Sequence, residues 1–305
     1  MWLLFTLATT AFWSLAELFY KKGARPDEKY AHLKIAVCVG FVMGVHAIAT
    51  LIFKPDLGYD PVNLIKYFPV SLCYILSMAL SFFGMRFIEE SISDPIENTS
   101  GAIAALLSVI FLGNAIAGPS VAGIIIILIG ILGVGYLENT GETKRSKKLG
   151  KTMAIVAFAM PFCYAIIDAV GSFLDIFYLD EVEASPLVNI TEETIEEVAN
   201  VSYELTFFAV AIILLVFMLI KGVKFDLPKQ RDKGIAALCE TAGQFTYVFA
   251  MSGNGTIAAP IISSVCVFSV ILSRIFLKEK LTKKQYFFIG LVLIGIIILG
   301  IVEGD

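Results

Sequence analysis

The chain has 305 residues, of which 58% are hydrophobic and only 16% are charged. Soluble domains carry about 25% charged residues, so the composition excludes an ordinary soluble globular domain. A net charge of −4 gives no sign of a nucleic-acid partner. The composition instead predicts an all-α polytopic membrane protein whose main surroundings are the lipid bilayer.

Ten stretches of mostly apolar residues follow one another along the chain, each near the roughly 20 residues that a helix needs to cross a bilayer. They cover residues 2–20, 33–53, 67–88, 93–113, 119–138, 152–178, 203–220, 234–252, 256–277 and 285–302. These stretches are too long and too uniform for the strands of a membrane barrel, so each is predicted to be a transmembrane helix. The first lacks a preceding basic segment and is expected to be a span, not a signal peptide.

Positive charges alternate between the predicted loops. One face of a ten-span arrangement holds all but two of the 23 Lys and Arg residues, and the opposite face holds only Lys54 and Lys66. Positive residues collect on the cytoplasmic side of membrane proteins. We therefore expect both termini outside the cell, the plasma membrane as the location, and the acidic segment 179–202 as an outer loop.

Two parts of the chain match each other. At an offset of 165 residues, the segment 91–116 aligns with 256–281, which pairs Pro95 with Pro260 and is followed by a glycine-rich helix in each case. We expect two five-helix repeats, residues 1–140 and 152–305, joined by a basic cytoplasmic linker at 141–151. Because five is an odd number, the second repeat is predicted to be inverted relative to the first, with a site near the midplane between them.

The second of these segments, APIISS followed by FSVILSRIFLKEKLTKKQYFFIGLVLIGIIILG, resembles an EamA-type domain of the drug/metabolite transporter superfamily. The resemblance extends to both repeats and implies a ten-helix transporter, but it is nearly silent about the substrate. The chain departs from the family pattern at Asn114, where the family usually has Glu, and at Asp94, Glu97 and Asn98, which replace apolar or small residues. Family members are also usually described with both termini in the cytoplasm, opposite to the charge pattern here.

Five carboxylates lie at least three residues inside a predicted span, and only Glu17 has a basic residue, Lys21, within one helical turn; the others are Glu97, Asp168, Asp175 and Glu240. A charge at the bilayer centre costs at least ~3 kcal/mol. Such groups are therefore expected to face a wet cavity and to meet protons or a cation. Local alternatives stay open: Glu17 could pair with Lys21 at the interface, Asp175 could be hydrated near the outer mouth, and Glu97 could cap a helix that begins at Pro95.

Aromatic and polar residues accompany these acids at helical spacing. An aromatic side chain precedes the acid by one turn at Trp13 and Glu17 and again at Tyr164 and Asp168, which puts each pair on one helix face. We expect Asp168 and Glu17 to carry protons. The predicted substrate-binding residues are Trp13, Glu17, Glu97, Asn98, Tyr164, Asp168, Glu240, Gln244 and Tyr247.

The leading hypothesis is a secondary transporter of a small organic solute, cationic or proton-coupled, that works by alternating access. The sequence contains no nucleotide-binding loop and no catalytic constellation, so neither an enzyme nor a cofactor is expected. The cysteines lie singly in apolar runs and the two histidines are isolated, so no metal site is expected. Two alternatives stay open, a flippase for a lipid or lipid-linked precursor and a non-transporting membrane scaffold, as does assembly into a homodimer.

Overall fold

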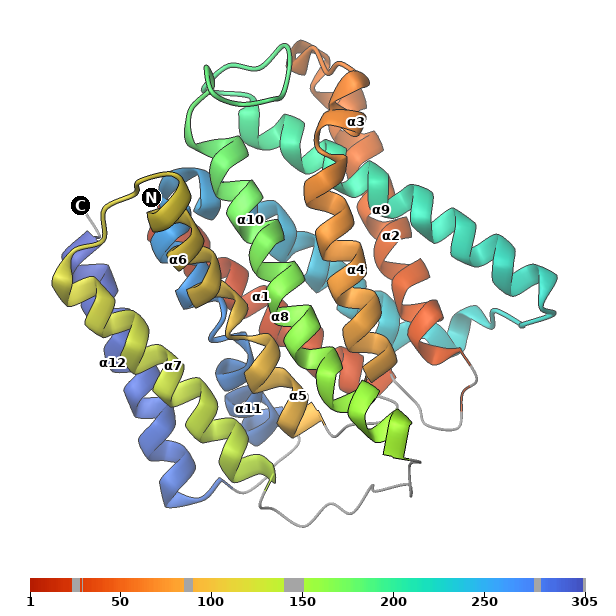
Figure 1. Cartoon of the computed structure of the whole chain (residues 1–305). Coiled ribbons are helices and arrows are strands. Elements are labelled where there is room, and N and C mark those ends of the chain that lie inside the picture. The colour runs from red at the N-terminus through yellow and green to blue at the C-terminus, as the bar shows by residue number, and fades with distance from the viewer. Residues whose placement is uncertain (24–27, 29, 85–89, 140–150, 277–280, 304–305) are drawn as a thin grey trace.

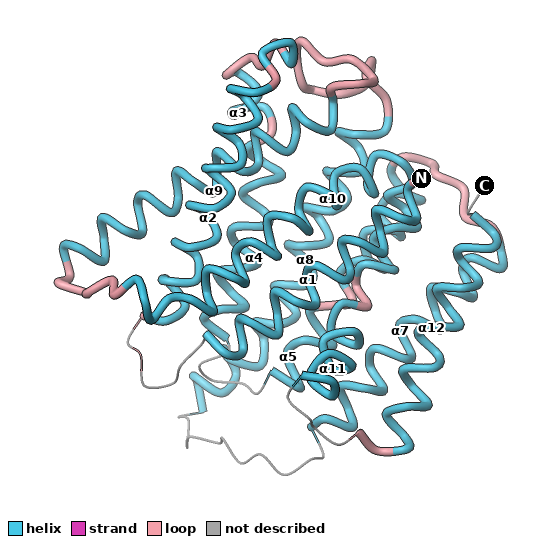
Figure 2. Tube along the Cα trace, turned by 180° about the vertical axis from the view of Figure 1, so that it is seen from behind, coloured by secondary structure: helices cyan, strands magenta, loops and turns pink. Residues whose placement is uncertain are grey.

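The computed structural model describes residues 1–23, 28, 30–84, 90–139, 151–276 and 281–303. Over these ranges the chain forms an α-helical bundle without a β-strand (Figures 1 and 2). The predicted linker 141–151 lies outside the described residues except for its last position, Lys151, where a helix begins.

The helices follow the predicted spans closely. Two short 3-10 turns, Pro55–Leu57 and Leu227–Gln230, lie in the connections. The α-helices are α1 (Trp2–Gly23), α2 (Ala31–Phe53), α3 (Val62–Lys66), α4 (Phe68–Gly84), α5 (Glu90–Glu97), α6 (Ser100–Phe111), α7 (Gly118–Asn139), α8 (Lys151–Asp180), α9 (Ile195–Ile220), α10 (Arg231–Ile262), α11 (Val265–Phe276) and α12 (Lys283–Glu303).

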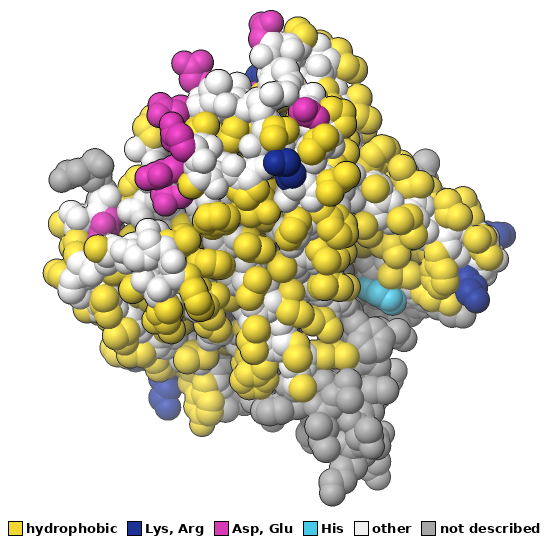
Figure 3. Space-filling view, turned by 45° about the horizontal axis from the view of Figure 1, so that its top comes forward, with side chains coloured by type: hydrophobic (Ala, Val, Ile, Leu, Met, Phe, Trp, Pro, Cys, Tyr) yellow, Lys and Arg dark blue, Asp and Glu magenta, His cyan; other side chains and the backbone are white. Residues whose placement is uncertain are grey.

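The helices have the length and surface of membrane spans. Among the described residues, α1, α2, α7, α8, α9 and α12 each contain a stretch long and apolar enough to cross a bilayer, and α10 with α11 forms a further bent pair. Large apolar side chains such as Ile52, Ile213 and Ile297 are more than half exposed on the outside of the bundle. Figure 3 shows these hydrophobic side chains as a broad belt, as expected for a surface that faces lipid.

Two of the predicted spans are broken at equivalent positions. α5 ends at Glu97 and α6 begins at Ser100, whereas α10 ends at Ile262 and α11 begins at Val265. Both breaks therefore keep the 165-residue offset of the sequence match. This agreement supports the repeat, while its exact limits, 1–140 and 152–305, stay a prediction. Broken helices in corresponding positions of two halves are typical of transporter binding sites.

The alternative in which Glu97 caps a helix that begins at Pro95 is wrong. α5 starts at Glu90 and runs through Pro95 to Glu97. The proline removes one helical hydrogen bond, which membrane helices tolerate when their neighbours compensate. The ring is accommodated by α7, because a Cβ atom on Gly135 would lie only 1.8 Å from Pro95 Cγ. Packing against this glycine therefore overrides the capping pattern of the sequence.

The helices pack in a pattern that is preserved when the two predicted repeats are exchanged. α2 packs on α9 and α7 on α12, which pairs the second span with the seventh and the fifth with the tenth. α1 packs on α10 and α4 on α8, so the first span of each repeat contacts the third span of the other. Such an arrangement is that of inverted repeats related by a pseudo-two-fold axis in the membrane plane.

The acidic loop is shorter than the predicted 179–202. α8 continues to Asp180 and α9 already begins at Ile195. Residues Ile195, Val198, Ala199 and Ser202 are buried, and this spacing gives the new helical turns one apolar face against the bundle. The first turn also contains two glutamates, which interact favourably with the positive end of the helix dipole.

The loop 181–194 and residues 54–67 around α3 cover one end of the bundle, which we call the acidic end. Asn63 holds the loop there, because its Nδ2 donates to Val188 O and its Oδ1 accepts from Val188 N, both at 2.9 Å. Lys66 Nζ donates to Pro186 O at 2.6 Å. Acidic side chains gather above the apolar belt in Figure 3, and the two chain termini lie close together in Figure 1.

An ionic cluster lies at the opposite end, which we call the basic end. Glu28 accepts hydrogen bonds from Lys34 Nζ at 2.6 Å and from Lys233 Nζ at 2.7 Å, and the Lys233 side chain is completely buried. Burial raises the pKa of the Glu28 carboxyl, but the hydrogen bonds from Lys233 and Lys34 outweigh this effect and lower the pKa to about 2. The cluster ties the start of α2 to the start of α10.

Candidate functional site

A cavity lies inside the bundle between α1, α4, α5, α6, α8, α9, α10 and α11. Its volume is about 180 Å³, counted at the centres of water-sized molecules. One water needs roughly 10–15 Å³ by this measure, so the space holds several waters or a small organic molecule. Both helix breaks face it, through Asn98 and Ser100 on one side and Ser263 and Val265 on the other.

The structure brings together most of the residues that the sequence singled out. Gln244 is the exception, because it is buried but does not belong to the cavity lining. The role of all these residues in substrate binding stays a prediction. The eight predicted residues that line the cavity are Trp13, Glu17, Glu97, Asn98, Tyr164, Asp168, Glu240 and Tyr247.

Two of the cavity acids are held by neutral hydroxyl groups. Asp168 on α8 accepts a hydrogen bond from Ser77 Oγ at 3.3 Å and further ones from Ser100 and Tyr164. Glu240 on α10 accepts one from the Tyr20 hydroxyl at 3.2 Å. These donors orient the carboxylates without neutralising them. The negative charge therefore remains available to a cation or a proton that enters the cavity.

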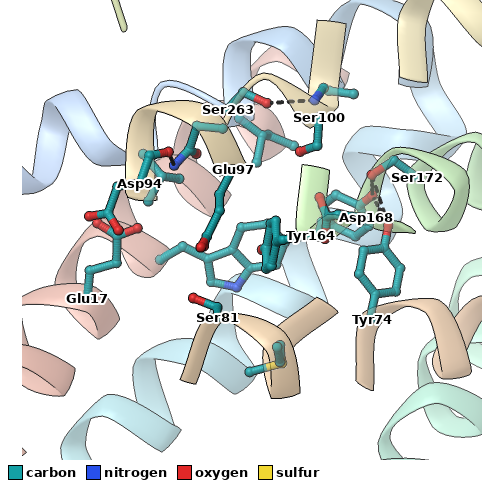
Figure 4. Close-up of a pocket in the computed structure, with 18 of the residues that line it drawn as sticks. Glu17, Tyr74, Ser81, Asp94, Glu97, Ser100, Tyr164, Asp168, Ser172 and Ser263 are labelled. Atoms are coloured by element: carbon teal, nitrogen blue, oxygen red, sulfur yellow. Dashed lines mark hydrogen bonds between the residues drawn. The ribbon is translucent and has the colours of Figure 1, made fainter. Parts of the chain in front are cut away.

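The other acids occupy the side of the cavity near α1 and α5. Figure 4 shows Glu17 and Asp94 close to each other, Asp168 on the opposite side, and Glu97 between them. Ser93 Oγ donates to Glu97 Oε1 within α5. Among the described residues that line the cavity, none is Lys, Arg or His.

Aromatic rings form much of the remaining wall. The Trp13 and Tyr247 rings are stacked with their centroids 5.1 Å apart, and Trp13 Nε1 donates to the Glu240 backbone oxygen at 3.3 Å. Gly243 permits this placement, since a Cβ atom there would lie 2.3 Å from Trp13 Cδ1. The faces of such rings attract cations when they are removed from water.

The cavity is more accessible at one end than at the other. Tyr74, Ser172, Tyr203 and Tyr247 are less than 10% exposed and form its closed end. Glu17, Ser81 and Asp94 are partly exposed, and they lie near the ends of α1 and α4 and within α5. Within the described residues, the partly exposed part of the lining therefore lies toward the basic end, and its buried, closed end lies toward the acidic end.

Several lining residues were missed by the sequence analysis. They include Tyr20, Tyr74, Ser172, Tyr203 and Ser263. A seven-residue spacing could have revealed part of this set, since residues two turns apart share one helix face. The spacing relates Tyr67 to Tyr74, Asp168 to Asp175 and Glu240 to Tyr247.

A buried acid of the seventh predicted span, residues 203–220, was also missed. Glu204 on α9 is completely buried and bonds His46 Nδ1 of α2 through both oxygens, at 2.8 and 2.9 Å. The pair lies between α2 and α9 and does not line the cavity. Within the described part of the chain, no group of three or more His, Cys, Asp or Glu side chains could hold a metal ion.

The chain matches the model of the EamA-like transporter family over residues 1–136 and 192–301. The protein belongs to this family. The match covers most of both halves and agrees with the resemblance seen in the sequence. From this membership and its long apolar helices, we conclude that the EamA-like chain is an integral membrane protein of a transporter family.

One solved structure, described only as "Crystal structure of protein", has the same fold. It is 14% identical in sequence with a TM-score of 0.73, and the alignment covers 99% of the EamA-like chain and 97% of the other. At this identity the likeness concerns the fold alone. The comparison with curated proteins found no match.

Proposed function

We propose that this protein is a secondary transporter that exchanges a small organic cation for protons by alternating access. The observation that carries the proposal is the pair Asp168 and Glu240, two cavity carboxylates that accept hydrogen bonds from Ser and Tyr hydroxyls. A carboxylate in a low-dielectric site attracts a cation strongly. The same oxygen atoms also take up protons, so cation and proton compete.

The surroundings of the two carboxylates fit an amine or a quaternary ammonium ion. Trp13, Tyr164 and Tyr247 line the same cavity and present aromatic surface beside the charge, which is how proteins recognise such ions. The membrane would be the plasma membrane with both termini outside, because the positive charges of the loops favour that orientation. The acidic end would then be the outer face, and the cavity would be open to the cytoplasm.

A stability screen tests the proposal. The purified protein is heated with choline, phenethylamine, glucose or succinate at pH 6 and pH 8. A ligand that binds only the folded state raises the melting temperature. We expect choline or phenethylamine to stabilise the protein, and choline to do so more at pH 8, because its own charge is permanent and fewer protons then compete for the carboxylates.

The matched variant is Asp168→Asn, which keeps the shape of the side chain and removes its charge. We expect the stabilisation by the cations to be lost in this variant. Stabilisation by glucose or succinate, together with no effect of either cation, would contradict the proposal. A cation effect that is unchanged in both Asp168→Asn and Glu240→Gln would contradict it as well.

A further inference from the structure

A buried cluster of one carboxylate and several tyrosines lies beyond the closed end of the cavity. Asp175, two turns after Asp168 on α8, is completely buried and is not part of the cavity lining. The sequence favoured a hydrated position for it near the outer mouth, but no part of it reaches water. It lies between the cavity and the acidic end, where α4 begins at Phe68.

Tyrosine hydroxyls from two other helices surround this carboxylate. Tyr67 donates to Asp175 Oδ1, and Tyr74 of α4 donates to Oδ2 at 2.8 Å. Tyr247 of α10 lies 2.6 Å from the Tyr74 oxygen. Tyr247 also donates to Ser172 Oγ at 3.4 Å. A network of hydrogen bonds therefore joins Asp175, Tyr74, Tyr247 and Ser172.

These bonds join the helices that would have to separate for the closed end to open. Asp175 belongs to α8 and Tyr247 to α10, both in the predicted second repeat, whereas Tyr67 and Tyr74 lie in the first. Tyr74, Ser172 and Tyr247 also form the floor of the cavity. The cluster is thus the contact that separates the cavity from the acidic end.

The titratable groups that face Asp175 are all neutral or acidic. They come from Tyr67 at the end of α3 and from α4, α8, α9 and α10, and among the described residues none of them is basic. They are Tyr67, Cys73, Tyr74, Asp168, Tyr178, Tyr203 and Tyr247. A buried carboxylate without a positive partner can lower its electrostatic cost by taking up a proton.

We propose that Asp175 is a second proton-binding site, separate from the cavity acids, and that a proton bound there releases the closed end of the cavity. The ionised carboxylate accepts bonds from Tyr67 and Tyr74 together and holds α4 against α8. The protonated carboxyl is itself a donor and offers fewer acceptor positions. Both tyrosine bonds cannot then persist unchanged, and α4 and α10 can move away from α8.

This inference rests on the alternating access of the proposed function, but its test needs no substrate. The reporter is Ser172→Cys, at the floor of the cavity, in a background without the five native cysteines. A membrane-impermeant cationic methanethiosulfonate is added to sealed vesicles of either orientation, at pH 5.5 and pH 8. The ratio of labelling rates from the two faces cancels the pH dependence of the thiol itself.

At pH 8 the parent protein is expected to be labelled from the basic end, with at least a tenfold preference. At pH 5.5 labelling from the acidic end should rise. Adding Asp175→Asn, which resembles the protonated acid, should give acidic-end labelling at both pH values. The control Asp180→Asn, which makes the same change at the exposed end of the same helix, should follow the parent.

Tyr67→Phe provides a second variant that keeps the carboxylate and removes one donor. Labelling from the acidic end at pH 8 should increase in this variant. If Asp175→Asn does not fold, this result alone tests whether the bonds to Asp175 keep the closed end shut. The inference would be overturned if the ratio of labelling rates from the two faces were the same at both pH values in the parent and in whichever of Asp175→Asn and Tyr67→Phe folds. That result would leave the cation screen unaffected, so the two proposals fail separately.

Discussion

Asp168→Asn is expected to reduce proton-driven uptake of the stabilising cation into reconstituted vesicles by about 100-fold. Asp168 lines the cavity and accepts hydrogen bonds from the hydroxyl groups of Ser77, Ser100 and Tyr164. Removing one partner of a desolvated ion pair costs about 3 kcal/mol or more, which is roughly a factor of 100 in binding. Uptake of choline or phenethylamine, driven by an acidic vesicle interior, measures the loss.

Asp180→Asn is the matched control for this substitution. It makes the same change on the same helix, but Asp180 is exposed at the end of α8. Uptake by this variant should stay within a factor of two of the parent. Equal activity of Asp168→Asn and the parent would show that Asp168 takes no part in transport.

Glu28→Gln is expected to destabilise the protein strongly at neutral pH. Lys233 is completely buried and its charge is balanced by Glu28 at 2.7 Å. Breaking a buried ion pair from one side costs about 3–5 kcal/mol, because the remaining charge loses its partner. The melting temperature of the purified protein in detergent, followed by intrinsic fluorescence, should fall by several degrees or more.

The pH dependence follows from the lowered pKa of Glu28. Its pKa falls from the usual 4.5 to about 2 in the folded protein, so the ion pair contributes its full stability above about pH 4.5. The contribution is lost as the pH falls toward 2. The melting temperatures of the parent and of Glu28→Gln should therefore differ most near pH 7 and converge in acid.

Asp226→Asn serves as the control for this second prediction. It removes the partner of Lys229, but both side chains of that pair are largely exposed, and exposed ion pairs contribute about 0–1 kcal/mol. A melting temperature equal to that of the parent is expected. If Glu28→Gln behaved in the same way at pH 7, the buried cluster would not stabilise the fold.

Much of the architecture could be predicted from apolar runs and from the internal match. A membrane span can be recognised in a sequence because a helix that crosses lipid needs about 20 mostly apolar residues. The pairing of Pro95 with Pro260 also pointed to equivalent positions in two halves. The breaks after Glu97 and Ile262 were not predicted, because each lies inside a run that was interpreted as one continuous span.

The candidate site was predictable only in part. The acids stand out against an apolar background, and helical spacing placed Trp13 beside Glu17. Gln244 shares that kind of spacing with Glu240 and yet lies outside the cavity lining, because one turn is too coarse a measure of the direction of a side chain. The tyrosines around Asp175 come from distant segments, and only the packing of α4 and α10 on α8 brings them together.

The central claim is that a cation and a proton compete for the carboxylates of the cavity. Proton release on binding measures this most directly: choline or phenethylamine, whichever stabilises the protein more, is added to concentrated protein in weakly buffered solution between pH 5 and 8. The account predicts that each bound cation displaces up to about one proton over part of this range and that Asp168→Asn releases fewer. Saturable binding of the cation with no proton release at any of these pH values would contradict it.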